Sequence, residues 1–454
     1  MRLAIRRATR LWHRDIYGDE LFRRLTRNSA YLFSASAVSA FLGLLTLAAT
    51  ANALGATGLG VLAIIEAYAK SVERLINFEP WQALVRYGTS ALEREDRTGF
   101  LRLVKASTLF DIGGATLAGA VAMLLAGFAS GLMKLEPEQA SMATIYSATL
   151  FFGLWSTPTA LLRIFDKFHL IAKFTVALAA FRLAMTVGAW WLSAGLWWFI
   201  AISMIFAVAL QLVPLAFAWR ELRLQGYRGV FATPLKNVIS DHPGILRFIW
   251  NANLNVVLRT ATQRFDVLIV AAILGPSATG LYQIARRSAQ AAMVVARPIQ
   301  QAIYPDIARL WARGEHERFR RIMLFTNFTI GATGLITLLV VSWKMRALVE
   351  LFFGPTFADA APLIIVQGFA IVLFLAGTTL NPALLSMGRD ATLARITLFG
   401  FIVFFIMITP MIYLFGAIGA NFTHVVFNVI WLTGASTVML RTTSAALKPA
   451  ADLT

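Results

Sequence analysis

The sequence contains no cysteine, and only 14% of its 454 residues are charged. The absence of cysteine excludes disulfides, thiol catalysis and thiolate metal sites. Average soluble domains carry about 25% charged residues, so the composition is not that of a soluble protein. Histidine is also scarce, and only Glu315-His316-Glu317 places one between two carboxylates. Nothing completes a metal site there, and we expect a solvated loop.

Apolar residues are abundant instead. They make up 58% of the chain, and the mean hydropathy is +0.69. Apolar runs of about 20 residues recur, each long enough to cross ~30 Å of hydrocarbon as a helix. We therefore predict an all-α polytopic membrane protein with twelve spans, near residues 29–53, 58–79, 105–131, 141–163, 170–193, 196–219, 247–274, 279–304, 322–343, 360–387, 392–415 and 417–440.

Basic residues exceed acidic ones, giving a net charge of +18. In a soluble protein this excess would suggest nucleic acid. In a membrane protein it is typical of cytoplasmic loops, so we expect no nucleic-acid partner. The basic connections follow the even-numbered spans, which places both termini in the cytoplasm. Residues 1–28 combine arginines with apolar side chains at helical spacing, and we expect a basic amphipathic arm on the cytoplasmic surface.

A repeat divides the chain into two halves of six spans. Leu54-Gly55 aligns with Leu274-Gly275, and Gly58-Leu59 aligns with Gly280-Leu281, each between two apolar spans. We predict two six-helix bundles related by pseudo-symmetry, as in transporters with parallel repeats. The boundaries that follow are an N-terminal lobe at 29–221, a cytoplasmic linker at 222–246, a C-terminal lobe at 247–441 and a cytoplasmic tail at 442–454.

Charged residues lie inside several predicted spans, where each costs ~2.5–3.5 kcal/mol on insertion scales. In the second span, Glu66, Lys70, Glu73 and Arg74 share one helical face. The in-span basic residues are Lys70, Arg74, Arg182, Arg259, Arg264, Arg286, Arg287 and Arg297, against only Glu66, Glu73 and Asp266. They are tolerable if they face one another or water. We predict a cationic cavity between the halves that attracts an anion, because the guanidinium fork suits phosphate oxygens.

Structural roles remain open for part of this set. Glu66 and Lys70 are well spaced for an ion pair. Arg287 serves either in the cavity or structurally, by snorkelling or contacting another helix. Asp266, Glu66 and Glu73 are either counter-ions for neighbouring arginines or the sites where an ion gradient is coupled.

A family resemblance rests on residues at the start of the second half. The run from Asp266 to Pro276, the following Gly280-Leu-Tyr-Gln-Ile-Ala and Tyr304-Pro305-Asp306 resemble the seventh and eighth helices of Wzx-type polysaccharide or O-antigen flippases. Those proteins belong to the multidrug/oligosaccharidyl-lipid/polysaccharide (MOP) exporter superfamily. The stretch from Phe353 to Leu363 is similar to the tenth-helix region of that family, and the resemblance covers essentially the whole chain.

The resemblance implies a MOP or MATE-like fold with a V-shaped cavity and alternating access. It implies a flippase that moves an undecaprenyl-diphosphate-linked oligosaccharide from the cytoplasmic to the periplasmic leaflet of the bacterial inner membrane, for O-antigen or exopolysaccharide assembly. The implied partners are the lipid bilayer, the lipid-linked glycan and the polysaccharide polymerase and export machinery. We expect a monomer without catalytic residues or cofactor, with coupling to a Na⁺ or H⁺ gradient left open.

With that cargo, six basic residues are predicted to line the cavity and contact the diphosphate: Arg286, Arg297, Lys70, Arg74, Arg259 and Arg182. A MATE-like multidrug antiporter is the main alternative, although such proteins tend to hold acidic residues in the cavity. A lipid II flippase usually has fourteen spans. A membrane glycan polymerase or glycosyltransferase would need a large loop or paired carboxylates. Adjacent acidic residues occur only at Asp19-Glu20 and Glu95-Asp96, in short basic segments.

Overall fold

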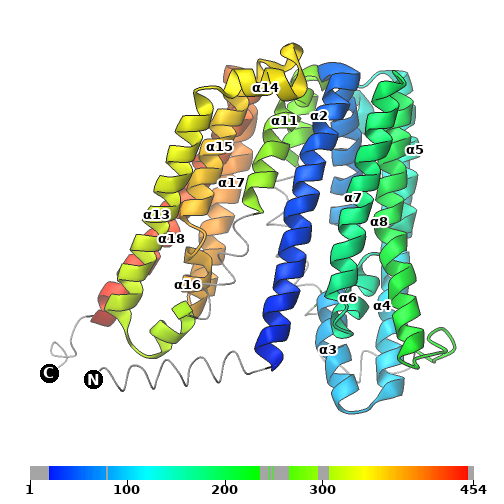
Figure 1. The fold of residues 1–454 in the computed structure, drawn as a ribbon, viewed down its shortest axis with the longest axis vertical. Helices are drawn as coiled ribbons and strands as arrows, with labels where there is room; N and C mark the ends of the chain where they lie inside the picture. The colour runs from blue at the N-terminus through cyan, green and yellow to red at the C-terminus, as the bar shows by residue number, and fades with distance from the viewer. Residues whose placement is uncertain are drawn as a thin grey trace.

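The computed structural model describes residues 20–77, 80–235, 245, 249, 265–294 and 306–447. These residues form helices and connecting turns, with no strand among them. The predicted all-α architecture is confirmed. The long helices stand roughly side by side, and the first described helix begins at the same end of the bundle as the last one finishes (Figure 1).

The first half of the chain contains the helices α2 (Glu20–Ile76), α3 (Trp81–Glu93), α4 (Arg97–Leu132), α5 (Pro137–Ser147), η1 (Ala148–Phe152), α6 (Ser156–Ile164), α7 (Phe168–Trp191) and α8 (Leu196–Leu224). The second half contains α10 (Phe265–Leu274), α11 (Pro276–Met293), α13 (His316–Ser342), α14 (Met345–Phe353), η2 (Pro355–Phe357), α15 (Ala360–Ala376), α16 (Leu380–Ser386), α17 (Asp390–Phe415) and α18 (Ala417–Leu447).

Eight helices among the described residues are long and apolar enough to cross a membrane. One of them, Tyr31–Ile76, contains predicted spans one and two, which meet at Gly55. The fourth predicted span is broken into α5, η1 and α6, and the tenth into α15 and α16. Parts of spans seven and eight lie outside the described residues. The total of twelve therefore stays a prediction.

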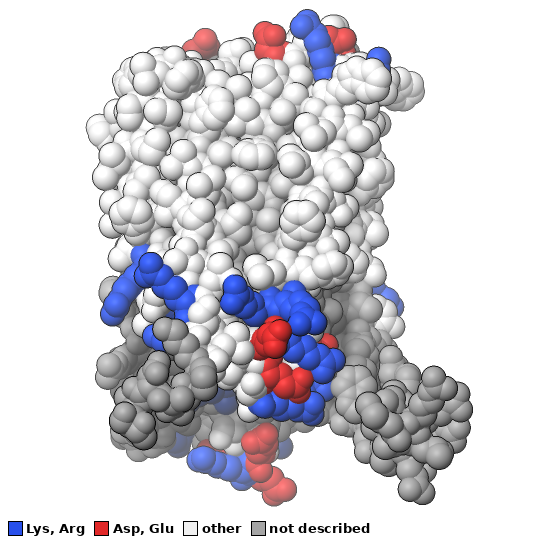
Figure 2. All heavy atoms as spheres, turned by 90° about the vertical axis from the view of Figure 1, so that its left-hand side faces the viewer, with Lys and Arg blue, Asp and Glu red and all other residues white. Residues whose placement is uncertain are grey.

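The charge distribution separates a broad uncharged band from two charged ends. Figure 2 shows this for the face that carries α13, where Lys, Arg, Asp and Glu gather above and below a wide uncharged surface. Large apolar side chains on α13 are exposed in that band, among them Phe325 at 71% and Phe328 at 76%. Such a surface is stable in hydrocarbon and would aggregate in water. The chain is a multi-pass membrane protein.

Two glycine turns repeat the same backbone conformation in the two halves. Gly55 has φ 66° and ψ −175°, and Gly275 has φ 84° and ψ −175°. Positive φ is strained for residues with a Cβ, so glycine permits the abrupt change of direction at both points. The residues before and after Gly55 then run back along each other, since Ser39, Thr46 and Glu66 line the same cavity.

The two helices that follow these turns contact each other through backbone atoms where they cross. A Cβ added to Gly60 would lie 1.8 Å from the carbonyl oxygen of Pro276, and one added to Gly280 would lie 2.0 Å from that of Ala56. Each glycine follows its turn by the same number of residues, so the contact is reciprocal, as across a two-fold axis. The structure therefore pairs Gly280 with Gly60, two residues from the predicted alignment of Gly280 with Gly58.

Gly60→Ala is expected to force the two helices apart. The carbonyl oxygen of Pro276 cannot move like a flexible side-chain end, and over-packing of this kind costs about 1–3 kcal/mol. The midpoint of thermal unfolding in detergent should fall. Gly113→Ala is the matched control, because its added Cβ meets nothing within 4 Å. Equal midpoints for the two variants would contradict the backbone crossing.

Candidate functional site

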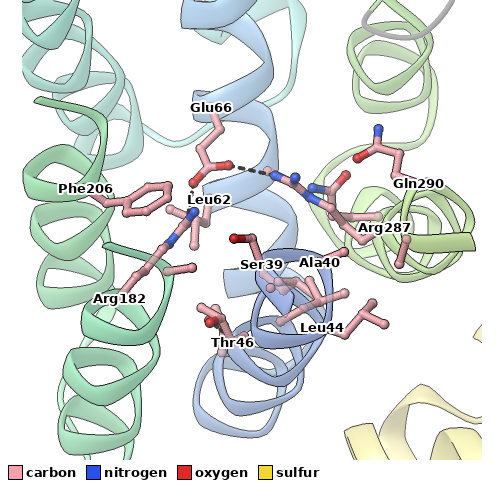
Figure 3. A pocket seen from close by; sticks show the side chains of 18 of the residues that line it. Ser39, Ala40, Leu44, Thr46, Leu62, Glu66, Arg182, Phe206, Arg287 and Gln290 are labelled. Carbon is pink, nitrogen blue, oxygen red and sulfur yellow. Dashed lines mark hydrogen bonds and ion pairs between the residues drawn. The ribbon is translucent and has the colours of Figure 1, made fainter. Parts of the chain in front are cut away.

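A cavity of about 340 Å³ lies between the first half of the chain and α11. Its walls come from both arms of α2, from α7 and α8, and from α11 of the second half. Figure 3 shows these helices around the space. The polar lining residues are Ser39, Thr46, Thr50, Glu66, Thr175, Arg182, Gln283, Arg287 and Gln290. The predicted cavity between the halves is therefore present, with α11 as the wall contributed by the second half.

One carboxylate in this cavity holds three cations. Glu66, only 5% exposed, accepts from Arg182 at 2.7 Å through Oε1 and from Arg287 at 3.1 Å through Oε2. Lys70 Nζ lies 3.6 Å from Oε2, on the next turn of α2. The Glu66 cluster, meaning these four residues, joins three helices and carries a formal surplus of two positive charges. Figure 3 shows Glu66 between Arg182 and Arg287.

Arg182 is fixed by more than its ion pair. Its Nη2 also lies 2.9 Å from the Ser203 hydroxyl, and its guanidinium sits 4.7 Å from the ring centroid of Phe206. The cation–π contact and the two polar contacts limit its rotamers. Its side chain keeps 20% exposure, while those of Arg287 and Lys70 keep 38%. Arg182 and Arg287 therefore present partly exposed guanidinium groups to the cavity.

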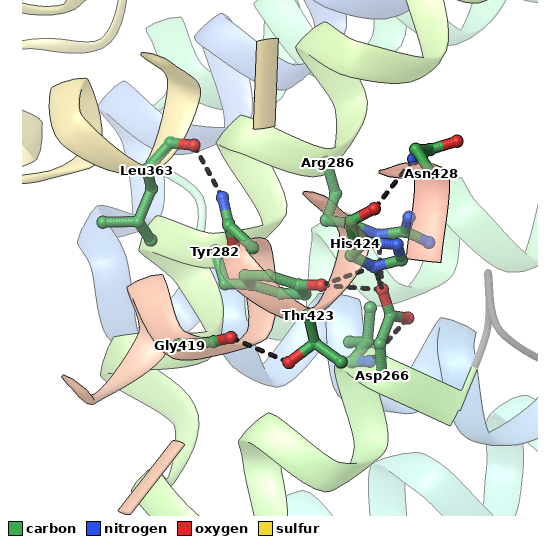
Figure 4. Close-up of polar contacts among 10 residues, drawn as sticks. Asp266, Tyr282, Arg286, Leu363, Gly419, Thr423, His424 and Asn428 are labelled. Carbon is green, nitrogen blue, oxygen red and sulfur yellow. Dashed lines mark hydrogen bonds and ion pairs between the residues drawn. The ribbon is translucent and has the colours of Figure 1, made fainter. Parts of the chain in front are cut away.

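A second charged cluster is buried within the second half. Asp266, at 0% exposure, lies in the first turn of α10 and accepts a hydrogen bond from the Tyr282 hydroxyl at 2.7 Å on Oδ2. Arg286 Nε and His424 Nε2 each lie 2.9 Å from the same oxygen (Figure 4). Oδ1 accepts the backbone N–H of Val267 at 2.8 Å. This Asp266 cluster ties α10, α11 and α18 together, and the four residues whose side chains form it are at most 6% exposed.

The structure distributes the predicted site residues over three environments. Lys70 and Arg182 belong to the Glu66 cluster. Glu73 and Arg74 follow on the next turn of α2 and are half-buried. Arg286 is 4% exposed, is paired with Asp266 and is not among the residues that line the cavity. Arg259 and Arg297 lie outside the described residues. Contact with a substrate stays a prediction for all six basic residues.

The sequence left the role of Arg287 open and did not assign Gln283 to the site. The signal that identifies both is Gly280, which marks the face of α11 that meets the first half. Gln283, Arg287 and Gln290 follow it at intervals of three, four and three residues, so they continue that face toward the cavity. Arg286 lies one residue, or about 100°, away on the face turned toward Asp266 of α10.

Contacts between the two halves gather at the end of the molecule where the two glycine turns lie. Asn52 Nδ2 donates to the Phe352 carbonyl oxygen at 3.0 Å, joining α2 to α14. Lys134 Nζ donates to the Ile273 carbonyl oxygen at 2.8 Å, joining the connection after α4 to α10. Together with the Gly60–Gly280 crossing, these contacts hold the two halves together at that end.

Comparisons with known proteins agree with this architecture. Residues 25–311 match the family described as "Polysaccharide biosynthesis protein". The chain is 31% identical to inner membrane protein YghQ of Escherichia coli K12 over 350 residues, which is 77% of this chain and 98% of that protein.

Solved structures share the fold at low sequence identity. An inward-facing multidrug-resistance MATE transporter of the MOP superfamily superposes with a TM-score of 0.67 at 13% identity, covering 93% of this chain and 96% of its own. The lipid II flippase MurJ, in an inward closed conformation, gives 0.63 at 14% identity, covering 92% and 90%. The predicted MOP-like fold is confirmed.

Proposed function

The chain belongs to the polysaccharide biosynthesis protein family, and we propose that it is a flippase for an undecaprenyl-diphosphate-linked oligosaccharide. It moves the glycan head from the cytoplasmic to the periplasmic leaflet of the inner membrane by alternating access, for O-antigen or exopolysaccharide assembly. Two of the solved proteins that share its fold are a multidrug transporter and a lipid flippase, which supports a transport function rather than an enzymatic one. The name of the 31% identical relative supports the inner membrane.

The observation that carries this proposal is the surplus of cations around Glu66. A diphosphate head is anionic, and its oxygens suit guanidinium groups that are already oriented. Arg182 and Arg287 approach the cavity from opposite walls, on α7 and α11. We assign the diphosphate contact to these two residues, assisted by Lys70. The polyprenyl tail needs no site of its own, because it remains soluble in the bilayer.

The direction of transport follows from the proposed orientation. Helix α2 begins and α18 ends at one end of the bundle, and we assign that end to the cytoplasm. The contacts of Asn52 and Lys134 then close the periplasmic end. In this state the cavity is poised to receive cargo from the cytoplasmic side.

A cation-exporting drug antiporter is the second candidate, because a MATE transporter shares the fold. A cationic drug needs a carboxylate that can turn toward it. Both oxygens of Glu66 already face basic side chains, and Asp266 is fully buried among its own partners. We therefore propose counter-ion roles for Glu66 and Asp266. Lipid II shares the polyprenyl diphosphate and differs in its glycan, so the transport assay must distinguish a lipid II flippase from a flippase for another oligosaccharide.

Transport of a fluorescent polyprenyl-diphosphate oligosaccharide into proteoliposomes tests the function. We expect wild-type protein to raise leaflet exchange at least about tenfold above empty liposomes, because a hydrated cavity lowers the barrier for the polar head. The same vesicles should not accumulate a dicationic dye under Na⁺ or H⁺ gradients. The flippase proposal would be falsified if the dye moved and the lipid-linked glycan did not. Lipid II, assayed in parallel, reports the glycan specificity.

A further inference from the structure

A groove at the outer edge of the first half collects three arginines that no described carboxylate pairs with. The groove measures about 340 Å³ and is lined by Ala216, Trp219, Arg220, Arg223, Leu224 and Arg228. It lies at the end of α8 and in the loop that follows, on the right of Figure 1 and away from α11. We call it the arginine groove. A second hollow shares Trp219, Arg223 and Arg228 with it.

Among the residues that the structure describes, these arginines lack a local counter-ion, unlike Lys167, Arg318 and Arg321. Glu221 comes from the same turn, but it is 7% exposed and pairs with Lys167 at 3.1 Å. On α13, by contrast, Arg318 and Arg321 are bound by Glu315 and Glu317, each at 3.1 Å. Three cations around one concave surface repel one another, and an anionic ligand would relieve that repulsion.

The loop that closes the groove is held in place. Lys105 Nζ donates to the carbonyl oxygens of Phe231 and Thr233 at 2.7 and 2.8 Å. Tyr227 packs its ring against Phe100, with centroids 5.0 Å apart, and Arg97 donates to the Gly226 carbonyl. Phe231 in turn stacks on Trp219 at 5.6 Å and 26°. These contacts hold the loop after α8 against the first half of the chain, so the arginine groove has a defined shape.

The surface leading to the groove is apolar and exposed. Ile205, Leu212 and Ala216 occupy one face of α8 at intervals of seven and four residues, and Arg220 and Arg223 continue the same face. Ile205 is 51% and Leu212 38% exposed. Leu224 and Phe231 flank the arginines at 66% and 55% exposure. The surface thus changes from hydrocarbon-compatible to cationic along a single helix.

We propose that the arginine groove binds the phosphate headgroup of an anionic phospholipid from the membrane leaflet beside it. An amphiphile with one anionic head and acyl chains matches both parts of the surface, the chains along the apolar face of α8 and the phosphate among the arginines. Basic pockets on the cytoplasmic side of membrane proteins are known to bind anionic lipid head groups. The site is separate from the Glu66 cluster, and it does not depend on the proposed glycan cargo.

Native mass spectrometry of the full chain tests the proposal, with phosphatidylglycerol and cardiolipin as probes and phosphatidylcholine as the reference lipid. Wild-type protein should retain an anionic lipid in preference to phosphatidylcholine. The combined variant Arg220→Gln, Arg223→Gln, Arg228→Gln should bind it about 100-fold more weakly, because each neutralised arginine removes about 1 kcal/mol, or roughly a factor of five in affinity. Arg318→Gln with Arg321→Gln is the matched control and should bind like wild type.

Ala216→Trp keeps every arginine and fills the groove, so it separates the site from the general charge of the loop. It should also lose the lipid while its thermal unfolding midpoint without lipid stays near that of wild type. Retention of the lipid by both Ala216→Trp and the triple variant overturns the proposal. Equal binding of phosphatidylcholine overturns it too. Displacement of the lipid by millimolar inorganic phosphate identifies a soluble-anion site instead.

Discussion

Replacing Arg182 and Arg287 together by glutamine should lower glycan-lipid transport by a factor of about 100 or more. Hydrogen bonds to charged groups contribute about 1.5–3 kcal/mol each, and both arginines face the cavity from opposite walls. The measurement is the initial rate of leaflet exchange in proteoliposomes, at matched amounts of inserted protein. Loss of rate without loss of insertion would show that the guanidinium groups act on the cargo.

A fold defect must be separated from this effect, because the double variant leaves Glu66 with Lys70 alone. Adding Glu66→Gln removes the buried charge together with its two arginine partners, and this triple variant should insert normally and remain inactive. Glu66→Gln by itself should keep substantial activity, since both guanidinium groups remain. Wild-type transport by the triple variant would rule out the diphosphate contact that we assign to these arginines.

Asp266→Ala should destabilise the protein more than Gly60→Ala or the loss of any exposed ion pair. It leaves Arg286, 4% exposed, without the carboxylate that Nε approaches at 2.9 Å, and it also removes the acceptor of Tyr282. Breaking one side of a buried ion pair costs about 3–5 kcal/mol. We expect a fall of roughly 6–10 °C in the thermal unfolding midpoint in detergent, at about 2 °C per kcal/mol.

Two further variants separate the loss of a buried charge pair from a general effect of mutation. Asp266→Asn with Arg286→Met removes the pair as a unit and should recover at least half of the lost stability, because no uncompensated charge remains. Glu350→Ala removes the exposed partner of Arg346 and should change the midpoint little, since surface ion pairs contribute ~0–1 kcal/mol. A midpoint for Asp266→Ala within 1–2 °C of the Glu350→Ala value, roughly the shift of a surface pair, would disprove a buried-charge role.

The sequence determined much of the fold because membrane insertion imposes few and local requirements. The positions of the apolar runs, the two glycine turns and the uncharged band all follow from hydropathy and from the need for positive φ at Gly55 and Gly275. The pairing of Glu66 with Lys70 is also local, since one helical turn separates them, and it is present at 3.6 Å.

The cavity contacts were harder to predict because they depend on how each helix is rotated about its axis. Arg286 and Arg287 are neighbours in sequence, yet one pairs with Asp266 in the core and the other with Glu66 in the cavity. Hydropathy cannot distinguish them, since both are arginine. His424 approaches Asp266 from α18, and no spacing rule connects residues so far apart in the chain. Packing of whole helices decides such contacts.

The reciprocal contact of Gly60 and Gly280 has a consequence for sequence divergence between the halves. Because the two helices meet there through backbone atoms, their docking does not depend on which side chains lie farther along them. Glu66 follows Gly60 by the same number of residues as Arg286 follows Gly280, so these two positions correspond in the repeat. Ala67 corresponds to Arg287 in the same way. Two identical copies would set glutamate against alanine across the axis. Because the two halves of one chain have diverged in sequence, Glu66 can instead face Arg287. The helix arrangement is thus symmetric while the charges that it places in the cavity are not.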